Sequence, residues 1–391
     1  MERTYGIEYG PHLAAFSVGY VLFSYASVPG AVVGQFDVGY TAVGLLMSAA
    51  LAAFVIVQPL GGRFVDGRST VPVLLGIVCA SSVLAVVMDL VDSFGSLLAL
   101  RALWGLAGGL AVTVCATQIS RVYTGPRATW HQGLNGGMFT AGGAVAYLVT
   151  PSVVDSTGWF GVHAVGALVA VPAGVVLWLD SDRADRTRPV TESVDSNPQR
   201  RTDGGTTPST LAVLRSPTVL LAAACNFATL GGYVTLSTFV AAYFADLGLA
   251  GPLSALALFV ASLGRLGGGI AVLRPSVPDG RVIAGAASVG AASLFVLLVA
   301  DGVALVALPL LALAAVSLPF GAIFKTASTA AGRDGTAVAF VVASGNVAAL
   351  LLPAITGHLR DATGEYTLAF ALIGLLNLVA AVAGIAIARR R

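Results

Sequence analysis

The sequence predicts an all-α integral membrane protein with twelve transmembrane helices, arranged as two pseudo-symmetric six-helix bundles. Hydrophobic residues make up 57% of the 391 residues and charged residues only 10%, whereas soluble domains carry about 25% charged residues. The mean hydropathy is +0.88. The apolar residues also form long runs, and two similar sets of runs flank one long polar segment. These three observations together predict the fold class.

Each predicted helix is a run of roughly 20 apolar residues, the length that crosses the hydrocarbon core of a bilayer. Glycines are frequent inside these runs and allow membrane helices to approach one another closely. In chain order the runs cover residues 11–35, 39–61, 71–90, 95–118, 130–151, 157–179, 217–244, 251–273, 280–300, 302–324, 336–356 and 366–388.

The loops between the runs differ in charge in a regular way. Arginines gather in alternate loops and at both chain ends, for example Arg68, Arg121 and Arg281, whereas the opposite loops carry acids such as Asp92 and Asp301. Cytoplasmic loops of membrane proteins carry the excess of positive charge. We therefore expect a multi-pass protein of the cell membrane with both termini in the cytoplasm.

A polar segment divides the chain into two related halves. It predicts an N-terminal bundle at residues 1–179, a cytoplasmic linker at 180–216 and a C-terminal bundle at 217–391. The stretch from Gly143 to Pro151 resembles the stretch from Gly345 to Pro353, and an Asp-x-Thr-Gly turn follows each, at Asp155 and Asp361. Such a repeat in register indicates a duplicated unit.

Two motifs in the first half resemble those of the major facilitator superfamily. The loop after the second run contains Gly62, Asp66 and Arg68, and the fourth run contains Arg101 followed by several glycines. The resemblance implies the major facilitator fold and a secondary transporter that works by alternating access. It also implies a cytoplasmic gate formed by Gly62, Asp66 and Arg68, in which the carboxylate meets positive helix ends or arginines of the other half.

Arg265 and Arg101 are the ionisable residues that stand inside predicted helices, where a charge is costly and therefore a candidate for function. Arg265 lies about 12 Å from the end of its run, near the middle of the bilayer, at a rise of about 1.5 Å per residue. Arg101 lies closer to the outer surface and is expected to reach outward and pair with Asp89 or Asp92. No acid stands in the middle of any run. An arginine without a carboxylate favours an anionic substrate.

Within the superfamily the pattern looks most like the nitrate/nitrite and cyanate-type anion permeases. The eighth run carries Arg265 followed by Leu-Gly-Gly, and the eleventh carries Gly345-Asn346, as in those carriers. Gln58 stands where they have a second arginine. The resemblance implies a small anion as substrate, such as nitrate, nitrite, cyanate or a carboxylate.

Polar side chains in the first, fifth, seventh and eleventh runs are further candidates for lining the substrate cavity. They are Tyr20, Ser24, Tyr25, Asn135, Tyr147, Asn226, Tyr233 and Asn346. The four histidines, at positions 12, 131, 163 and 358, lie nearer the ends of the runs than their centres. The sequence therefore does not support a histidine proton relay.

Several classes of function are disfavoured by what the sequence lacks. It has no nucleotide-binding P-loop and no cluster of histidine and cysteine with metal-ligand spacing, so we expect no enzyme, cofactor or metal site. The arginines at the end of the sequence are typical of a membrane anchor rather than of a site that binds nucleic acid. The family resemblance implies a monomer. An exporter of neutral or hydrophobic compounds, or less favourably a non-transporting membrane receptor, remains the alternative.

Overall fold

The computed structural model describes residues 5–65, 68–123, 125–182, 215–249, 251–272, 277–330 and 334–390. Most of the predicted linker lies outside the described residues. Its first residues, Asp180 to Asp182, are described, and Asp180 is buried. The Asp180 carboxylate accepts hydrogen bonds from the backbone N–H groups of Gly6 (2.6 Å) and Ile7 (3.3 Å), which ties the end of the sixth span to the start of the chain.

The first half consists of helices that follow the predicted runs. In chain order they are α1 (Tyr5–Glu8), α2 (Gly10–Phe23), the 3-10 turn η1 (Tyr25–Ser27), α3 (Pro29–Phe36), α4 (Tyr40–Val65), α5 (Thr70–Met88), α6 (Phe94–Val122), α7 (Gly125–Thr157) and α8 (Val165–Leu179).

The second half repeats the same arrangement. Its helices are α10 (Pro217–Asp246), α11 (Pro252–Val272), α12 (Asp279–Leu297), α13 (Ala304–Ser317), α14 (Phe320–Thr329), α15 (Asp334–Thr363) and α16 (Thr367–Arg389). Within the described residues, ten helical segments are long and apolar enough to cross a membrane, and Gly10–Phe23 and Val165–Leu179 are shorter apolar helices. The all-helical membrane fold predicted from the sequence is confirmed.

The first predicted span is not one continuous helix. Helix α2 ends at Phe23, and the chain continues through η1 before α3 begins at Pro29. Proline has no N–H to donate and disfavours the helical conformation of the residue before it, and Val28 accordingly leaves the helical region at φ −131° and ψ 55°. The break leaves backbone carbonyl groups at the end of α2 without helical partners.

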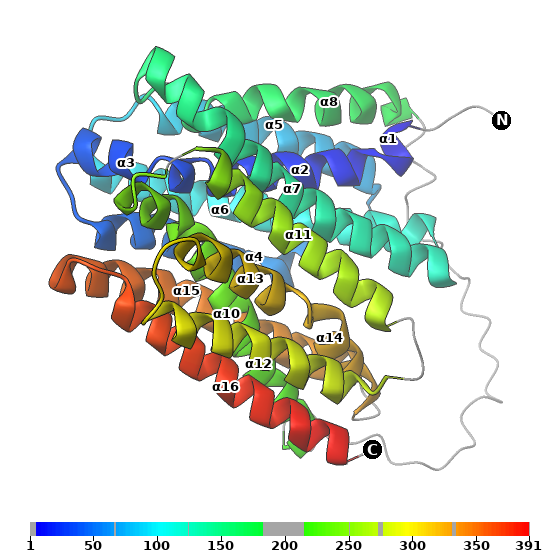
Figure 1. The fold of residues 1–391 in the computed structure, drawn as a ribbon. Coiled ribbons are helices and arrows are strands. Elements are labelled where there is room, and N and C mark those ends of the chain that lie inside the picture. The colour runs from blue at the N-terminus through cyan, green and yellow to red at the C-terminus, as the bar shows by residue number, and fades with distance from the viewer. Residues whose placement is uncertain are drawn as a thin grey trace, which may run out of the picture.

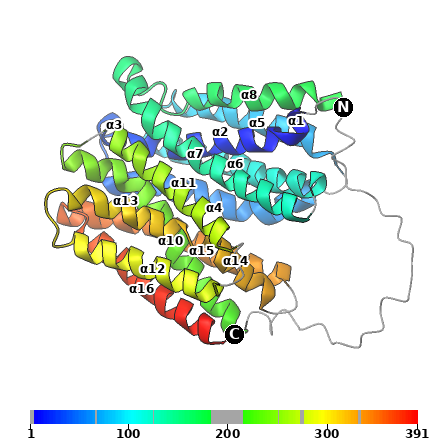
Figure 2. The same cartoon turned by 45° about the vertical axis from the view of Figure 1, so that its right-hand side comes forward.

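The two halves contact each other mainly at one end of the molecule. We call the end where α1 begins and α16 ends the terminal side, and the opposite end the far side. Figures 1 and 2 show the two halves close together on the far side and spread apart on the terminal side. Across the halves, α4 packs against α15 and α7 packs against α11.

Close backbone contact between α4 and α15 holds the far side together. A Cβ atom added at Gly44 would collide with the carbonyl group of Pro353, and one added at Gly357 would collide with that of Tyr40. Only glycine allows two helix backbones to come this near. Ser48 adds a hydrogen bond of 2.5 Å from its hydroxyl to the carbonyl of Leu350.

A carboxylate also joins the halves at the far end of these two helices. Asp361 of α15 accepts hydrogen bonds from the backbone N–H groups of Tyr40 and Thr41, both at 2.7 Å, and from the Thr41 hydroxyl at 2.5 Å. Asp361 therefore caps the N-terminus of α4 from the other half of the molecule. Beside it, Arg360 forms an ion pair of 2.7 Å with Asp246.

Candidate functional site

Arg101 is built into the break of the first span. Its side chain is completely buried, and its guanidinium lies over the rings of Tyr25 (4.6 Å) and Trp104 (5.0 Å). It donates a hydrogen bond of 2.8 Å to the carbonyl of Val21 and another to that of Leu22. These are carbonyl groups that the end of α2 leaves free, so Arg101 takes the place of the missing helical turn.

The sequence-based expectation that Arg101 would reach outward to Asp89 or Asp92 is wrong. Asp89 is occupied by the segment before α8, where it accepts hydrogen bonds from the N–H groups of Gly161, His163 and Ala164 and contacts the His163 ring at 2.7 Å. Burial lowers the pKa of His163 despite this carboxylate. The Asp89 carboxylate is therefore satisfied locally and serves the packing of the first half, whereas Nε2 of His163 is buried without a partner among the described residues.

Arg265, by contrast, has donors that no described residue uses. Helix α11 holds it, half-buried, with its guanidinium 4.2 Å from the ring centre of Tyr233 on α10 and 4.5 Å from that of Phe320 on α14. The two rings are perpendicular to each other. Within the part of the chain that the structure describes, Arg265 makes no hydrogen bond, and its Nε and the Tyr233 hydroxyl are buried without partners.

This arrangement suits the binding of an anion. Aromatic rings stabilise the guanidinium charge through their faces and fix the orientation of its plane. The N–H groups along the edge of that plane remain free, and they match the two oxygens of a carboxylate or a planar oxyanion. The rigid aromatic contacts also reduce the conformational entropy that Arg265 would lose on binding.

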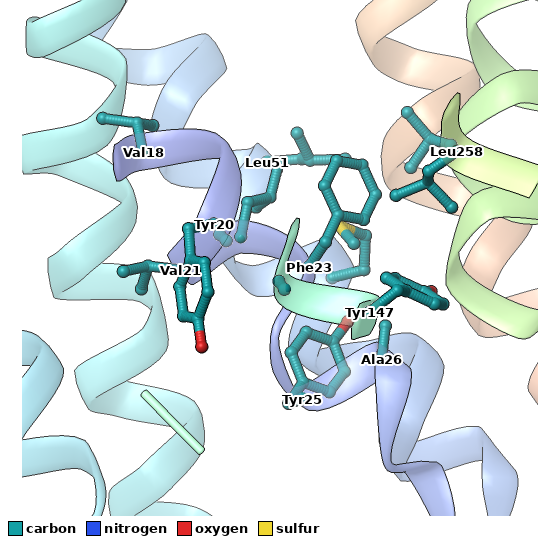
Figure 3. Packing of buried hydrophobic residues seen from close by; sticks show 14 of the residues in the cluster. Val18, Tyr20, Val21, Phe23, Tyr25, Ala26, Leu51, Tyr147 and Leu258 are labelled. Carbon is teal, nitrogen blue, oxygen red and sulfur yellow. The ribbon is translucent and has the colours of Figure 1, made fainter. Parts of the chain in front are cut away.

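Three of the other predicted cavity residues are committed to helix contacts. The Tyr25 hydroxyl donates to the Val43 carbonyl (3.3 Å), and the Asn226 amide donates to the Val341 carbonyl (2.8 Å). The Tyr147 hydroxyl donates to the carbonyl of Ser237 in the other half. Figure 3 shows Tyr25 and Tyr147 in this packed region, together with Phe23 and Leu258.

The remaining predicted residues differ in how far they are available. Asn346 is half-buried and makes no hydrogen bond to any described residue, so it resembles Arg265 in having free polar groups. Asn135 is buried in the first half. Asp66 lies outside the described residues, and so does the side chain of Gln58. The surroundings of Gly62 are likewise not described. Arg68 is exposed, and its carbonyl accepts a hydrogen bond of 2.8 Å from Arg121.

An open depression with a volume of about 520 Å³ lies along the terminal-side half of α6. It is lined by two apolar and three hydroxyl side chains: Val112, Ala116, Thr113, Thr117 and Ser120.

Sequence reasoning missed a contact between two histidines. His12 of α2 and His131 of α7 approach within 3.0 Å, Nε2 to Nδ1, with their rings nearly parallel. The Tyr123 ring stacks on His131 at 3.7 Å between ring centres. The sequence indicated this contact only in part: each histidine lies at the beginning of a predicted run, and both runs start on the same side of the membrane. The packing of the first span against the fifth decides that they meet.

Comparisons with known proteins agree with the fold. The sequence model of the Major Facilitator Superfamily matches residues 12–334. No curated protein sequence matches the chain. Among solved structures, the chain resembles a bacterial homologue of the human lysosomal transporter Spinster, in an inward-facing and unoccupied conformation. The TM-score is 0.72 at 16% sequence identity, over 100% of this chain and 96% of that one.

The family match covers most of the chain, and the two six-helix halves have the arrangement that the match requires. The sequence, the fold and the comparisons lead to the same conclusion. This chain belongs to the major facilitator superfamily and is a multi-pass membrane transporter that works by alternating access.

Proposed function

We propose that the protein carries a small anion across the cell membrane and binds it at Arg265, between the two halves. The observation that carries this proposal is the contrast between the two buried arginines. Arg101 donates from both of its terminal nitrogens to backbone carbonyls, and only its Nε is left without a partner. Arg265 also lies against two aromatic rings, but it makes no hydrogen bond to any described residue. A free, oriented guanidinium near the middle of a transporter favours a carboxylate, nitrate, nitrite or cyanate ion.

The same proposal includes the orientation of the protein and its movement. The terminal side, which carries most of the arginines of the sequence, is the cytoplasmic side. The conformation described here is then open to the cytoplasm and closed on the outside by the contacts of α4 with α15. Gly62, Asp66 and Arg68 form the gate that closes the cytoplasmic side in the opposite conformation, and the monomer is the transporting unit.

Uptake of radiolabelled anions into proteoliposomes tests the anion proposal. The panel consists of nitrate, nitrite, cyanate and acetate, and the variants are Arg265→Gln and Arg265→Lys. A hydrogen bond to a charged group contributes about 1.5–3 kcal/mol, so Arg265→Gln should raise KM by about ten- to a hundredfold. Arg265→Lys keeps the charge but loses the planar pair of donors, so its effect should be smaller.

Arg281→Gln is the matched control, because Arg281 is exposed at the start of α12. It removes the same charge and should leave uptake unchanged. Full uptake of all transported anions by Arg265→Gln would refute the role of Arg265.

The alternative is an exporter of neutral or hydrophobic compounds, and one observation favours it. Aromatic rings surround Arg265 beyond its two direct partners: Phe23 lies 6.3 Å from Tyr233, and Phe324 lies 6.3 Å from Phe320. If the protein is such an exporter, the Arg265→Gln variant should still transport an uncharged dye. None of the four anions should then be taken up by the wild type.

A further inference from the structure

The geometry points to a second binding site in the first half. We propose that His12 and His131 together bind one proton, and that this proton is the coupling ion of the transport cycle. The first part stands on the geometry of the two rings alone. The second part rests on the proposed anion transport.

The contact between the rings is a hydrogen bond between two imidazoles. Nε2 of His12 and Nδ1 of His131 are 3.0 Å apart, so one nitrogen carries the proton and the other accepts it. A neutral imidazole has one donor and one acceptor, whereas a protonated one has two donors. The pair can therefore take up one proton and keep the bond between the rings.

A second proton would break the pair. Both facing nitrogens would then carry hydrogen, and two cations would lie with ring centres 5.3 Å apart. Like charges at this distance repel strongly when they are partly removed from water. The geometry therefore fixes the capacity of the site at one proton for two rings.

The structure also provides a place for that proton. Nδ1 of His12 and Oδ1 of Asn135 are both buried without a hydrogen-bond partner among the described residues. Asn135 lies one helical turn from His131 on α7, and its side chain is within hydrogen-bonding reach of the His12 ring. When Nδ1 of His12 is protonated, it can donate to Oδ1 of Asn135 while Nε2 donates to His131. The two buried atoms that are unpaired in the described conformation then become partners of each other, which is favourable for buried groups.

The surroundings carry both signs of charge. Glu8 of α1 and Arg127 of α7 place charges of opposite sign near His131, and Tyr123 at the end of α6 stacks on its ring. Cys115 of α6 contacts the carbonyl of Pro11 beside His12, and the Asp180 carboxylate is held by the backbone of α1. The described neighbours therefore place charges of both signs beside the pair. Histidine is the side chain that titrates near physiological pH.

The position of the pair suits coupling to an anion. His131 and Asn135 belong to α7, which packs against α11, the helix of Arg265. A proton on the pair adds one positive charge to a transporter that has no acid in the middle of its predicted spans. Anion and proton would then favour each other's binding, and both would leave on the terminal side in the conformation described here.

A titration followed by nitrogen NMR tests the proton site without any substrate. The chain contains four histidines, so ¹⁵N-histidine labelling of the full-length protein in nanodiscs gives few signals, and His12→Gln and His131→Gln assign the pair. Between about pH 8 and about pH 4, a range that brackets the ordinary histidine pKa, the two rings should shift together as one proton binds. His163, held by Asp89, reports that each variant is folded. Independent titration of the rings, two protons on the pair, or no proton at all would overturn the proposal.

A transport assay tests the coupling. Uptake of nitrate and acetate into proteoliposomes is measured with and without an acidic outside. A gradient of one pH unit can drive up to about tenfold accumulation of an anion that is coupled to one proton. It should therefore accelerate uptake by the wild type, and His12→Gln and His131→Gln should lose this acceleration. His358→Gln, at an exposed position of α15, should keep it.

The two proposals fail in different ways. If neither anion is taken up, the anion proposal fails, and the NMR titration still decides the proton site. If uptake occurs but His12→Gln retains the full acceleration, the coupling role is refuted, and Arg265 is unaffected.

Discussion

Removal of the Asp361 carboxylate should open the far side of the protein. In the conformation described here, Asp361 of α15 accepts three hydrogen bonds from Tyr40 and Thr41 at the N-terminus of α4. The two helices belong to different halves, so these bonds exist only while the far side is closed. In a rocking mechanism they must break each time the transporter opens on that side.

The size of the effect follows from the chemistry of a helix cap. Loss of a capping side chain costs about 0.5–2 kcal/mol, and a negative charge at a helix N-terminus adds about 0.3–1 kcal/mol. Because Asp361 is exposed, we take the lower part of these ranges. Asp361→Ala should then shift the equilibrium by about 0.8–1.9 kcal/mol, or roughly four- to twenty-fivefold. Asp361→Asn keeps a capping oxygen and loses only the charge, so its shift should be about two- to fivefold.

Distance measurements between spin labels can detect this shift. Labels at positions 92 and 301 stand on far-side loops of the two halves and move apart when that side opens. Asp155→Ala is the matched control. Asp155 occupies the equivalent place in the sequence repeat, but the helix it would face, α11, begins at Pro252, which has no N–H to offer. If Asp361→Ala and Asp155→Ala give the same distance distribution, the cap does not hold the far side closed.

Two further predictions separate packing from substrate binding. Arg101→Gln should lower the unfolding temperature in detergent far more than Arg265→Gln. Arg101 is fully buried, and its two backbone hydrogen bonds are worth about 1.5–3 kcal/mol each. Equal unfolding temperatures of the two variants would contradict the structural role of Arg101. Gly357→Val should separate α15 from α4, because its side chain would occupy the position of the Tyr40 carbonyl, and should thus favour the conformation open on the far side. Spin-label distances unchanged from the wild type would contradict this second prediction. Gly302→Ala, in an open turn between α12 and α13, is the control for a general loss of stability.

The sequence alone predicted the all-helical membrane fold. In lipid every helix must satisfy its own backbone hydrogen bonds, so a membrane span is encoded locally by length and hydropathy. For this reason the twelve predicted runs correspond closely to the observed helices. Two spans differ. The predicted run 302–324 is divided into α13 and α14. In the first span, the influence of Pro29 on Val28 was present in the sequence but was outweighed by the continuous hydropathy.

The tertiary structure decided which polar residues are free. Arg101 and Arg265 stand at different depths in their apolar segments, but the sequence does not show which groups each of them meets. Arg101 is occupied by carbonyl groups of α2, 79 and 80 positions away along the chain, whereas Arg265 lies against aromatic faces and makes no hydrogen bond to a described residue. The contact of His12 with His131 spans 119 positions, and the cap of Asp361 on α4 spans about 320. The packing of helices against one another determines such partners, and the hydropathy of a segment does not show which other helix it contacts.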